Sequence, residues 1–234
     1  MKLSRLVALV LFAAAMAWME SATVLYLRTL VHRIEPYQAS PMPAANNLGS
    51  VEIIREGATL LMLGSAGFLG GKSWRSRFGS FLVAFGVWDI LYYAFLAIIV
   101  GWPKTLFDWD VLFLIPLPWW GPVLSPILVS CALIAVGFLL IGSEGKSWYR
   151  QPSRASWGAY WIGTALALYA FMQNSIEQLW IPGHGELAAL PTKFNWPLLL
   201  VGLAFMLSPI FETVIQVAGN RRAKDDVVES ERRW

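Results

Sequence analysis

The chain has 234 residues, of which 57% are hydrophobic and only 14% are charged, whereas about 25% of the residues in a typical soluble domain are charged. The net charge of +3 is spread over loops and tails, without a basic arm interleaved with aromatic residues, which argues against nucleic acid as a partner. The composition is that of a membrane protein, so the lipid bilayer is an expected partner. The single cysteine, Cys131, excludes an intrachain disulfide and a cysteine metal cluster, and its apolar surroundings favour a small buried side chain.

Six apolar segments are long enough to cross a bilayer, which takes about 20 helical residues. They cover residues 3–31, 50–70, 79–101, 121–142, 157–180 and 196–218. None of them alternates as a barrel strand does, and backbone groups in lipid must be satisfied within each segment. We therefore predict an all-α fold: a polytopic membrane helix bundle with about six transmembrane helices. It forms one domain over residues 1–220, followed by a charged cytoplasmic tail over residues 221–234.

The first segment begins like a secretory signal, with two basic residues, an apolar core and the small residues AAAMA. Its apolar part continues to Leu27, however, whereas a signal core has about 7–15 residues. We therefore expect a first membrane helix that is retained.

Basic residues predict the orientation of the helices. The connecting segments at 71–79 (GKSWRSRFG) and 143–156 (SEGKSWYRQPSRAS), together with both tails, hold most of the Lys and Arg. By the positive-inside rule these parts face the cytoplasm, so both termini are expected there. The segment GKSW occurs at 71–74 and at 145–148. This pair leaves two interpretations open: a duplicated helical hairpin, or two loops that each favour Gly, a basic residue and an interfacial Trp.

Residues 107–122, FDWDVLFLIPLPWWGP, are apolar and aromatic, but Pro116, Pro118 and Pro122 prevent one straight helix. We predict an irregular interfacial or re-entrant segment, which lies in the outer interface or dips into the bundle. Such backbone is tolerated where protein or a cavity, not lipid, surrounds it. A segment of this kind would serve as a lid.

Several polar residues lie inside the predicted spans, where an ionised side chain costs roughly 2.5 to 3.5 kcal/mol on insertion scales. Such residues usually face the bundle interior or a water-filled cavity. Counted at about 1.5 Å per residue, most of them lie in the outer half of the bundle, and one lies near its midplane. The predicted ligand-binding set is Glu20, Glu52, Arg55, Glu56, Asp89, Tyr92, Tyr93, Asn174 and Glu177.

Each of these residues also has a structural interpretation. Glu52 and Glu56 stack one turn apart on the same helix face. Arg55 lies beside them and is expected to neutralise Glu56 or Glu20, and an ion-paired trio of this kind can be purely structural.

Asp89 likewise has a structural alternative, because Tyr92 and Tyr93 follow it three and four residues later. A phenol could donate to it, or a protonated Asp89 could tie helices together. Asp108 and Asp110 are expected among headgroups and water, where a charge needs no partner.

The supply of ligands limits metal and cofactor chemistry. Only His32 and His184 are present, both in expected outer loops, and neither an HExxH nor a Glu-x-x-His motif occurs. We therefore expect no cofactor. The carboxylates of the predicted set would suit Ca²⁺, Mg²⁺ or Mn²⁺ if they converge, and the sequence leaves a metal site open.

Four stretches, EIIREGATLLML, GVWDILYYAFL, GWPKTLFDWDVLFLIPLPW and GPVLSPILVS, together resemble a group of bacterial six-helix membrane proteins that carry no assigned function. The similarity runs from MESATVLYLR, which begins at residue 19, to about residue 136. It implies a multi-pass protein of the bacterial cytoplasmic (inner) membrane, and it brings no activity, ligand or catalytic residue.

Three classes of function remain open. The first is a polar, carboxylate-lined, outward-facing site between the first, second, third and fifth helices, which binds a small ligand or cation for transport or sensing. The second is a non-catalytic accessory or scaffold subunit with other membrane subunits as partners. The third is an intramembrane lipid-modifying enzyme that uses Asp89 or Glu56 as general acid or base. Since no recognisable catalytic set is present, a non-enzymatic role is the expectation.

Overall fold

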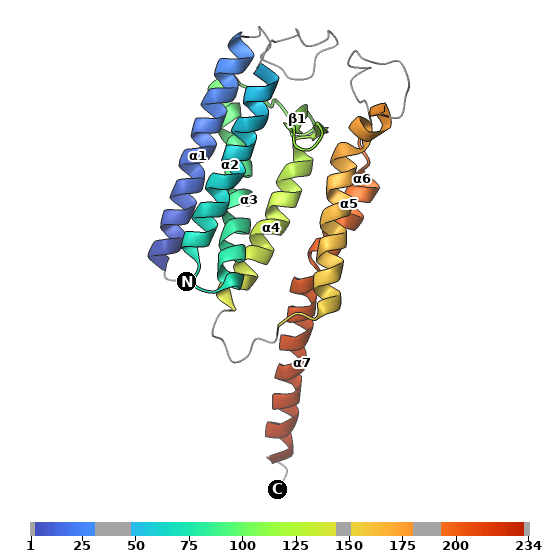
Figure 1. Ribbon diagram of the computed structural model, residues 1–234. Coiled ribbons are helices and arrows are strands. Elements are labelled where there is room, and N and C mark those ends of the chain that lie inside the picture. Colours follow the sequence, from blue (N-terminus) through green and yellow to red (C-terminus); the bar gives the residue numbers. More distant parts are fainter. Residues whose placement is uncertain (1–2, 31–47, 144–150, 180–192, 232–234) are drawn as a thin grey trace.

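The computed structural model describes residues 3–30, 48–143, 151–179 and 193–231, and in these it consists mainly of helices that run back and forth along one axis (Figure 1). The helices are α1 Leu3–Leu30, α2 Leu48–Gly70, α3 Trp74–Val100, α4 Leu124–Gly142, α5 Arg154–Leu179, α6 Trp196–Met206 and α7 Ser208–Glu231. Two strands, β1 Trp109–Phe113 and β2 Trp119–Pro122, lie between α3 and α4. The prediction of a helical bundle is confirmed, and each predicted apolar segment is largely helical.

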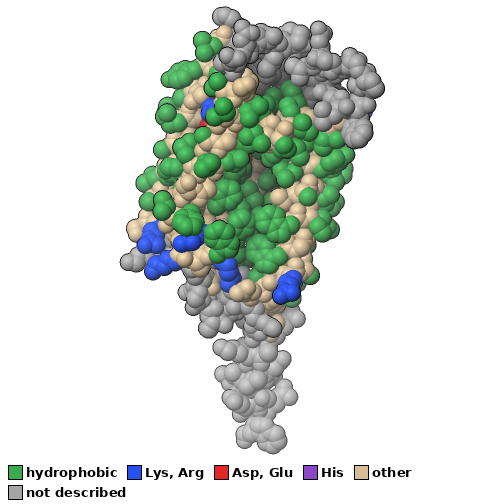
Figure 2. Space-filling view, in the orientation of Figure 1, with side chains coloured by type: hydrophobic (Ala, Val, Ile, Leu, Met, Phe, Trp, Pro, Cys, Tyr) green, Lys and Arg blue, Asp and Glu red, His purple; other side chains and the backbone are tan. Residues whose placement is uncertain are grey.

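Among the described residues, α1, α3 and α4 are long and apolar enough to cross a membrane. The pair α6 and α7 would be a fourth span if it crosses as one bent unit. Large hydrophobic side chains are exposed on the outside of the helices, and Figure 2 shows them over most of one face. This surface suits a lipid solvent, so length and composition support a membrane protein with three or four such spans.

The predicted sixth span is two helices rather than one. α6 ends at Met206, α7 begins at Ser208, and the two meet at 43°. Pro209 explains the break, because it has no N–H for the carbonyl four residues earlier and its ring clashes with that carbonyl.

Helix α3 has a defined cap at each end. Ser73 precedes it and accepts a hydrogen bond from the Ser76 backbone N–H, while the Ser76 side chain reaches back to the cap backbone. This capping box satisfies free N–H groups at the helix start. Gly101 ends the helix with a φ of 71°, a left-handed conformation that costs glycine little.

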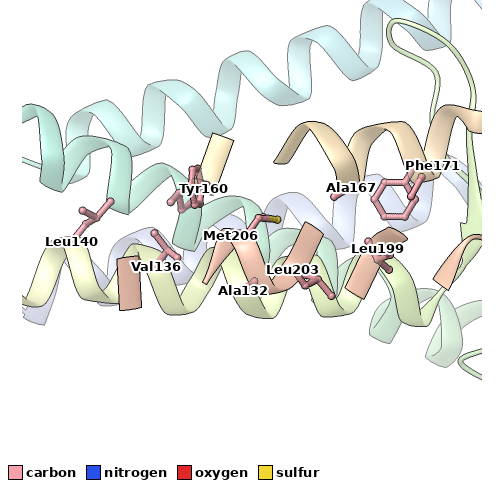
Figure 3. Close-up of a cluster of buried hydrophobic side chains, with 11 residues drawn as sticks. Ala132, Val136, Leu140, Tyr160, Ala167, Phe171, Leu199, Leu203 and Met206 are labelled. Atoms are coloured by element: carbon pink, nitrogen blue, oxygen red, sulfur yellow. The ribbon is translucent and has the colours of Figure 1, made fainter. Parts of the chain in front are cut away.

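An apolar core joins α4, α5 and α6 (Figure 3). Its labelled side chains are Ala132, Val136 and Leu140 of α4, Tyr160, Ala167 and Phe171 of α5, and Leu199, Leu203 and Met206 of α6. Glycines let α5 and α6 approach closely, since a Cβ on Gly163 would lie 2.4 Å from the Gly202 carbonyl oxygen. Small residues at such contacts are typical of helix association in lipid, where burial of apolar surface gives little driving force.

The segment at 107–122 folds as a β-hairpin instead of remaining irregular throughout. β1 and β2 are antiparallel, with Trp109 opposite Pro122 and Phe113 opposite Trp119. Phe113 is buried in a second apolar core with side chains of α1, α2 and α3, including Trp88. The hairpin therefore packs against the helices on its inner side, although most of its residues are only half-buried.

The two ends of the bundle differ in character. The hairpin lies at one end, and α1 begins and α7 ends at the other (Figure 1). On the face in Figure 2, Lys and Arg side chains gather toward the end where α1 begins. The last part of α7 projects beyond the other helices (Figure 1).

Some sequence expectations fall outside the described residues: those on His32, His184 and the second GKSW segment. Cys131 is described, and it is exposed on α4 rather than buried as predicted. On a helix face that contacts lipid, a small apolar side chain gains nothing by turning inward, because lipid tails are as apolar as the protein core.

Candidate functional site

Arg55 is the centre of a charged group on α1 and α2. Its guanidinium pairs with Glu20 of α1, and its Nη2 lies 2.8 Å from a Glu52 carboxylate oxygen one turn earlier on α2. Thr59 donates its hydroxyl to Glu20 over 3.3 Å. Of the two expected partners of Arg55, the structure thus pairs it with Glu20, and it adds Glu52.

Glu56 points to the hairpin instead of joining the Arg55 pairs. Its side chain is buried, and Oε2 accepts a 2.8 Å hydrogen bond from the backbone N–H of Leu114. A carboxylate that accepts from a backbone N–H forms a charge-assisted hydrogen bond, which is stronger than a neutral one. Glu56 therefore fastens the residue that follows β1 to the body of α2.

Asp110 corrects one sequence expectation, because this residue of β1 is buried rather than exposed to headgroups and water. Only 2% of its surface is exposed. Its carboxylate pairs with Arg28 of α1 at 3.3 Å and accepts from the Tyr93 hydroxyl of α3 at 3.3 Å. The Arg28 guanidinium also lies 4.3 Å from the centre of the Trp102 ring. The hairpin is thus tied to α1 and α3 as well as to α2.

Burial raises the pKa of the Asp110 carboxyl to about 6, while the Arg28 charge and the Tyr93 hydroxyl act in the opposite direction. Asp108, two residues earlier, behaves differently. Burial of this carboxyl is slight, and hydrogen bonds from Thr105 and from the Lys104 and Thr105 backbone N–H groups lower its pKa. Asp108 stabilises a turn, whereas Asp110 holds the hairpin in place.

Asp89 pairs with α4 rather than with a neighbouring phenol. The hydroxyl of Ser130 donates to its Oδ2 over 2.8 Å. Tyr93 uses its hydroxyl for Asp110, and Tyr92 contributes its backbone carbonyl, which accepts from Ser21 over 3.0 Å. Asp89 therefore ties α3 to α4, which agrees with the predicted tie between helices; its protonation in that interpretation stays a prediction.

The residues predicted on the fifth helix form a separate polar group. Gln173 donates to Glu177 over 2.8 Å and accepts from Asn195 over 3.0 Å. Asn174 is half-buried on the same helix. The hydrogen bonds described for this group lead to the start of α6, not to Arg55 or Asp110.

We use the name hairpin-end cluster for seven charged or phenolic residues, which are the Arg55 ion pairs, the Asp110 contacts and the Glu56 contact taken together: Glu20, Arg28, Glu52, Arg55, Glu56, Tyr93 and Asp110. Five of them were candidates from the sequence, and Arg28 and Asp110 were not. Within the described residues, no group of three or more His, Cys, Asp or Glu side chains is placed to hold a metal ion. Arginines form ion pairs with Glu20, Glu52 and Asp110.

Three comparisons bear on identity. The chain matches no protein-family model, no curated protein and no solved structure.

Proposed function

We propose that this chain is a multi-pass protein of the bacterial inner membrane that binds a small ligand or cation at the hairpin-end cluster, for transport or sensing. The observation that carries the proposal is that a group of paired charges lies next to the residue that holds the hairpin. Glu20, Glu52 and Arg55 form a paired group, and the adjacent Glu56 fastens the hairpin. A ligand that takes the place of Arg55 as the partner of these carboxylates would change the surroundings of Glu56, and with them its hydrogen bond to the hairpin.

The proposed topology has six spans and both termini in the cytoplasm. It is supported by the position of both chain ends at one end of the bundle and by the Lys and Arg side chains gathered there (Figures 1 and 2). The hairpin-end cluster then faces outward. This topology requires that α2 and α5 also cross the membrane, in addition to α1, α3, α4 and the α6–α7 pair. Contacts with neighbouring helices would shield part of the surface of α2 and α5 from lipid.

The chemistry of the site favours a ligand with positive charge. Arg55 occupies the position between Glu20 and Glu52 that a bound cation would take, so it acts as an internal counter-ion. Carboxylate oxygens suit hard cations such as Ca²⁺, Mg²⁺ and Mn²⁺. Binding of such an ion requires Arg55 to move away, which makes the site selective for ions that compete with a guanidinium.

Thermal unfolding in detergent tests this proposal with CaCl₂, MgCl₂ and MnCl₂ as probes. A cation at about 100 times its dissociation constant stabilises the protein by about 2.7 kcal/mol, which raises the midpoint by roughly 5–10 °C in a chain of this size. We expect Glu56→Gln and Glu52→Gln, which each remove one carboxylate of the hairpin-end cluster, to abolish the shift. Glu212→Gln is the matched control, since Glu212 lies at the other end of the bundle and accepts from Ser153.

Two outcomes would overturn the cation proposal. One is the absence of a shift in the wild-type protein with any of the three cations. The other is a shift that Glu56→Gln and Glu52→Gln retain at the size seen in Glu212→Gln.

A second candidate function is an accessory subunit of a larger membrane complex. One observation favours it: the end of α7 projects beyond the bundle as a single helix (Figure 1). A polar helix that stands alone is marginal in water, so a partner helix would stabilise it. This candidate predicts co-purification with other chains in fixed stoichiometry, and truncation after residue 219 should abolish it.

A further inference from the structure

A cavity of about 380 Å³ lies between α2, α3, α4 and α5, toward the end of the bundle where α1 begins. Its wall is aromatic, formed by Phe68 of α2, Phe78 and Phe81 of α3, and Trp157 and Trp161 of α5. Figure 2 shows hydrophobic side chains gathered between these helices, with basic side chains below them. The volume falls within the range of small-molecule sites, roughly 300–1,000 Å³.

Two arginines of α3, Arg75 and Arg77, also line this cavity, and none of its described lining residues is acidic. The Arg77 guanidinium lies 3.9 Å from the centre of the Phe68 ring, and its Nε donates to the Gly71 carbonyl. Positive charge is thus held directly against the aromatic wall. A ligand that matches both features has an apolar chain and an anionic group.

We propose that this cavity binds an anionic membrane phospholipid. Its acyl chain lies along the aromatic wall, and its phosphate lies at Arg75 and Arg77. The cavity opens between exposed apolar helix surfaces, where lipid is the surrounding solvent, and basic pockets between membrane helices are suited to anionic headgroups. Free phosphate would gain nothing from the apolar wall.

This inference is independent of the proposed function. The residues that line the cavity come from the first turns of α3 and α5 and the last turns of α2 and α4. These helix ends lie at the end of the bundle opposite the hairpin (Figure 1). Loss of lipid binding would leave the cation shift intact, and absence of that shift would leave lipid binding intact.

Native mass spectrometry of delipidated protein tests the inference, with dioleoyl phosphatidylglycerol as probe and dioleoyl phosphatidylcholine as its zwitterionic counterpart. We expect the wild-type protein to retain the anionic lipid preferentially. An arginine near an anionic headgroup is worth about fivefold in affinity, so the double variant Arg75→Gln/Arg77→Gln should lose about 25-fold. Arg154→Gln, an exposed charge outside the cavity lining, should retain wild-type binding.

A steric variant keeps the test independent of charge. Gly64 lines the cavity, and a Cβ there meets nothing within 4 Å, so Gly64→Leu fills the space without a clash at its Cβ. Gly57→Leu is its control, because Gly57 has the same open surroundings on α2 but does not line this cavity. We expect Gly64→Leu to abolish lipid retention and Gly57→Leu to preserve it.

Three results would overturn the inference. They are equal retention of the two lipids by the wild-type protein, unchanged retention in Gly64→Leu, and displacement of the lipid by inorganic phosphate. The last result would mean that the arginines bind the headgroup alone and that the aromatic wall contributes nothing.

Discussion

The pair of Arg28 and Asp110 is the most buried of the ion pairs among the described residues, and it makes stability depend on pH. Burial raises the pKa of Asp110 to about 6, so the folded state holds this proton more tightly than the unfolded state does. The stabilisation from this group is fully present below about pH 4 and is lost as the pH rises through about 6.

The free energy of unfolding of the wild-type protein should therefore fall by on the order of 3 kcal/mol between pH 4 and 7, at about 1.4 kcal/mol for each unit by which the pKa is raised. Asp110→Asn removes the titrating group. The free energy of unfolding of this variant should therefore lack the fall between pH 4 and 7, whether the variant is more or less stable than the wild-type protein. Parallel profiles for the two proteins across this range would show that Asp110 does not titrate there.

Ser130 is the described partner of Asp89, and its loss should cost stability in proportion to one hydrogen bond between membrane helices. We expect Ser130→Ala to lower the free energy of unfolding by about 1 kcal/mol. In an Asp89→Ala background the same substitution should cost less, because the acceptor is gone. Ser65→Ala is the control, as Ser65 is exposed on α2. An equal cost in both backgrounds would contradict the pairing.

Sequence could predict some of these contacts and not others. Arg55 lies three residues after Glu52, and that spacing alone brings the two side chains together. Asp108 and Asp110 are two residues apart in the same aromatic stretch, and nothing local shows which one is buried. Their difference depends on Arg28 and Tyr93, which come from distant helices.

The hairpin is the element whose position depends most directly on one side chain of the predicted site. Glu56→Ala leaves the Leu114 N–H without its acceptor, and a hydrogen bond to a charged group is worth about 1.5–3 kcal/mol. Amide hydrogen exchange over residues 109–122 should therefore become about 10- to 100-fold faster. Glu56→Gln keeps an acceptor and should show a smaller increase. Unchanged exchange in Glu56→Ala would show that other contacts hold the hairpin.

Helices α5 and α6 depend on glycine at their contact. A side chain at Gly163 would meet the Gly202 carbonyl oxygen at 2.4 Å and the Met206 nitrogen at 2.7 Å. Overpacking of this kind costs about 1–3 kcal/mol, so Gly163→Leu should lower the unfolding midpoint by roughly 2–12 °C. On the same helix, Gly158 faces open space, so Gly158→Leu should change the unfolding midpoint little. Similar midpoints for the two variants would contradict this helix contact.

At this scale, apolar length predicted where the helices lie, because helix formation is the way for a single segment to satisfy its backbone in lipid. The hairpin was missed for a physical reason. Its sequence lacks the alternation of polar and apolar residues that marks a half-buried strand, since both faces of the hairpin meet apolar side chains. Its prolines indicated only that a long helix was impossible.

The proposed topology puts both chain ends on one side of the membrane, and direct labelling of cysteine variants tests it. In a Cys131→Ser background, Lys104→Cys should react with a membrane-impermeant maleimide in intact cells, since Lys104 is exposed at the hairpin end. Arg154→Cys at the other end should react only after permeabilisation. The reverse pattern would invert the orientation, and reaction of both in intact cells would contradict the six-span arrangement.

The central claim is that the hairpin-end cluster binds a small ligand or cation, and native mass spectrometry of the gently solubilised protein from its own membrane tests it most directly. The proposal predicts a chain that carries a small bound mass and loses it in Glu56→Gln but not in Glu212→Gln. A chain that carries no small mass and is found only with other subunits in fixed stoichiometry would contradict the claim. Glu20, Glu52, Arg55 and Glu56 would then have only the structural role of holding the helices and the hairpin together.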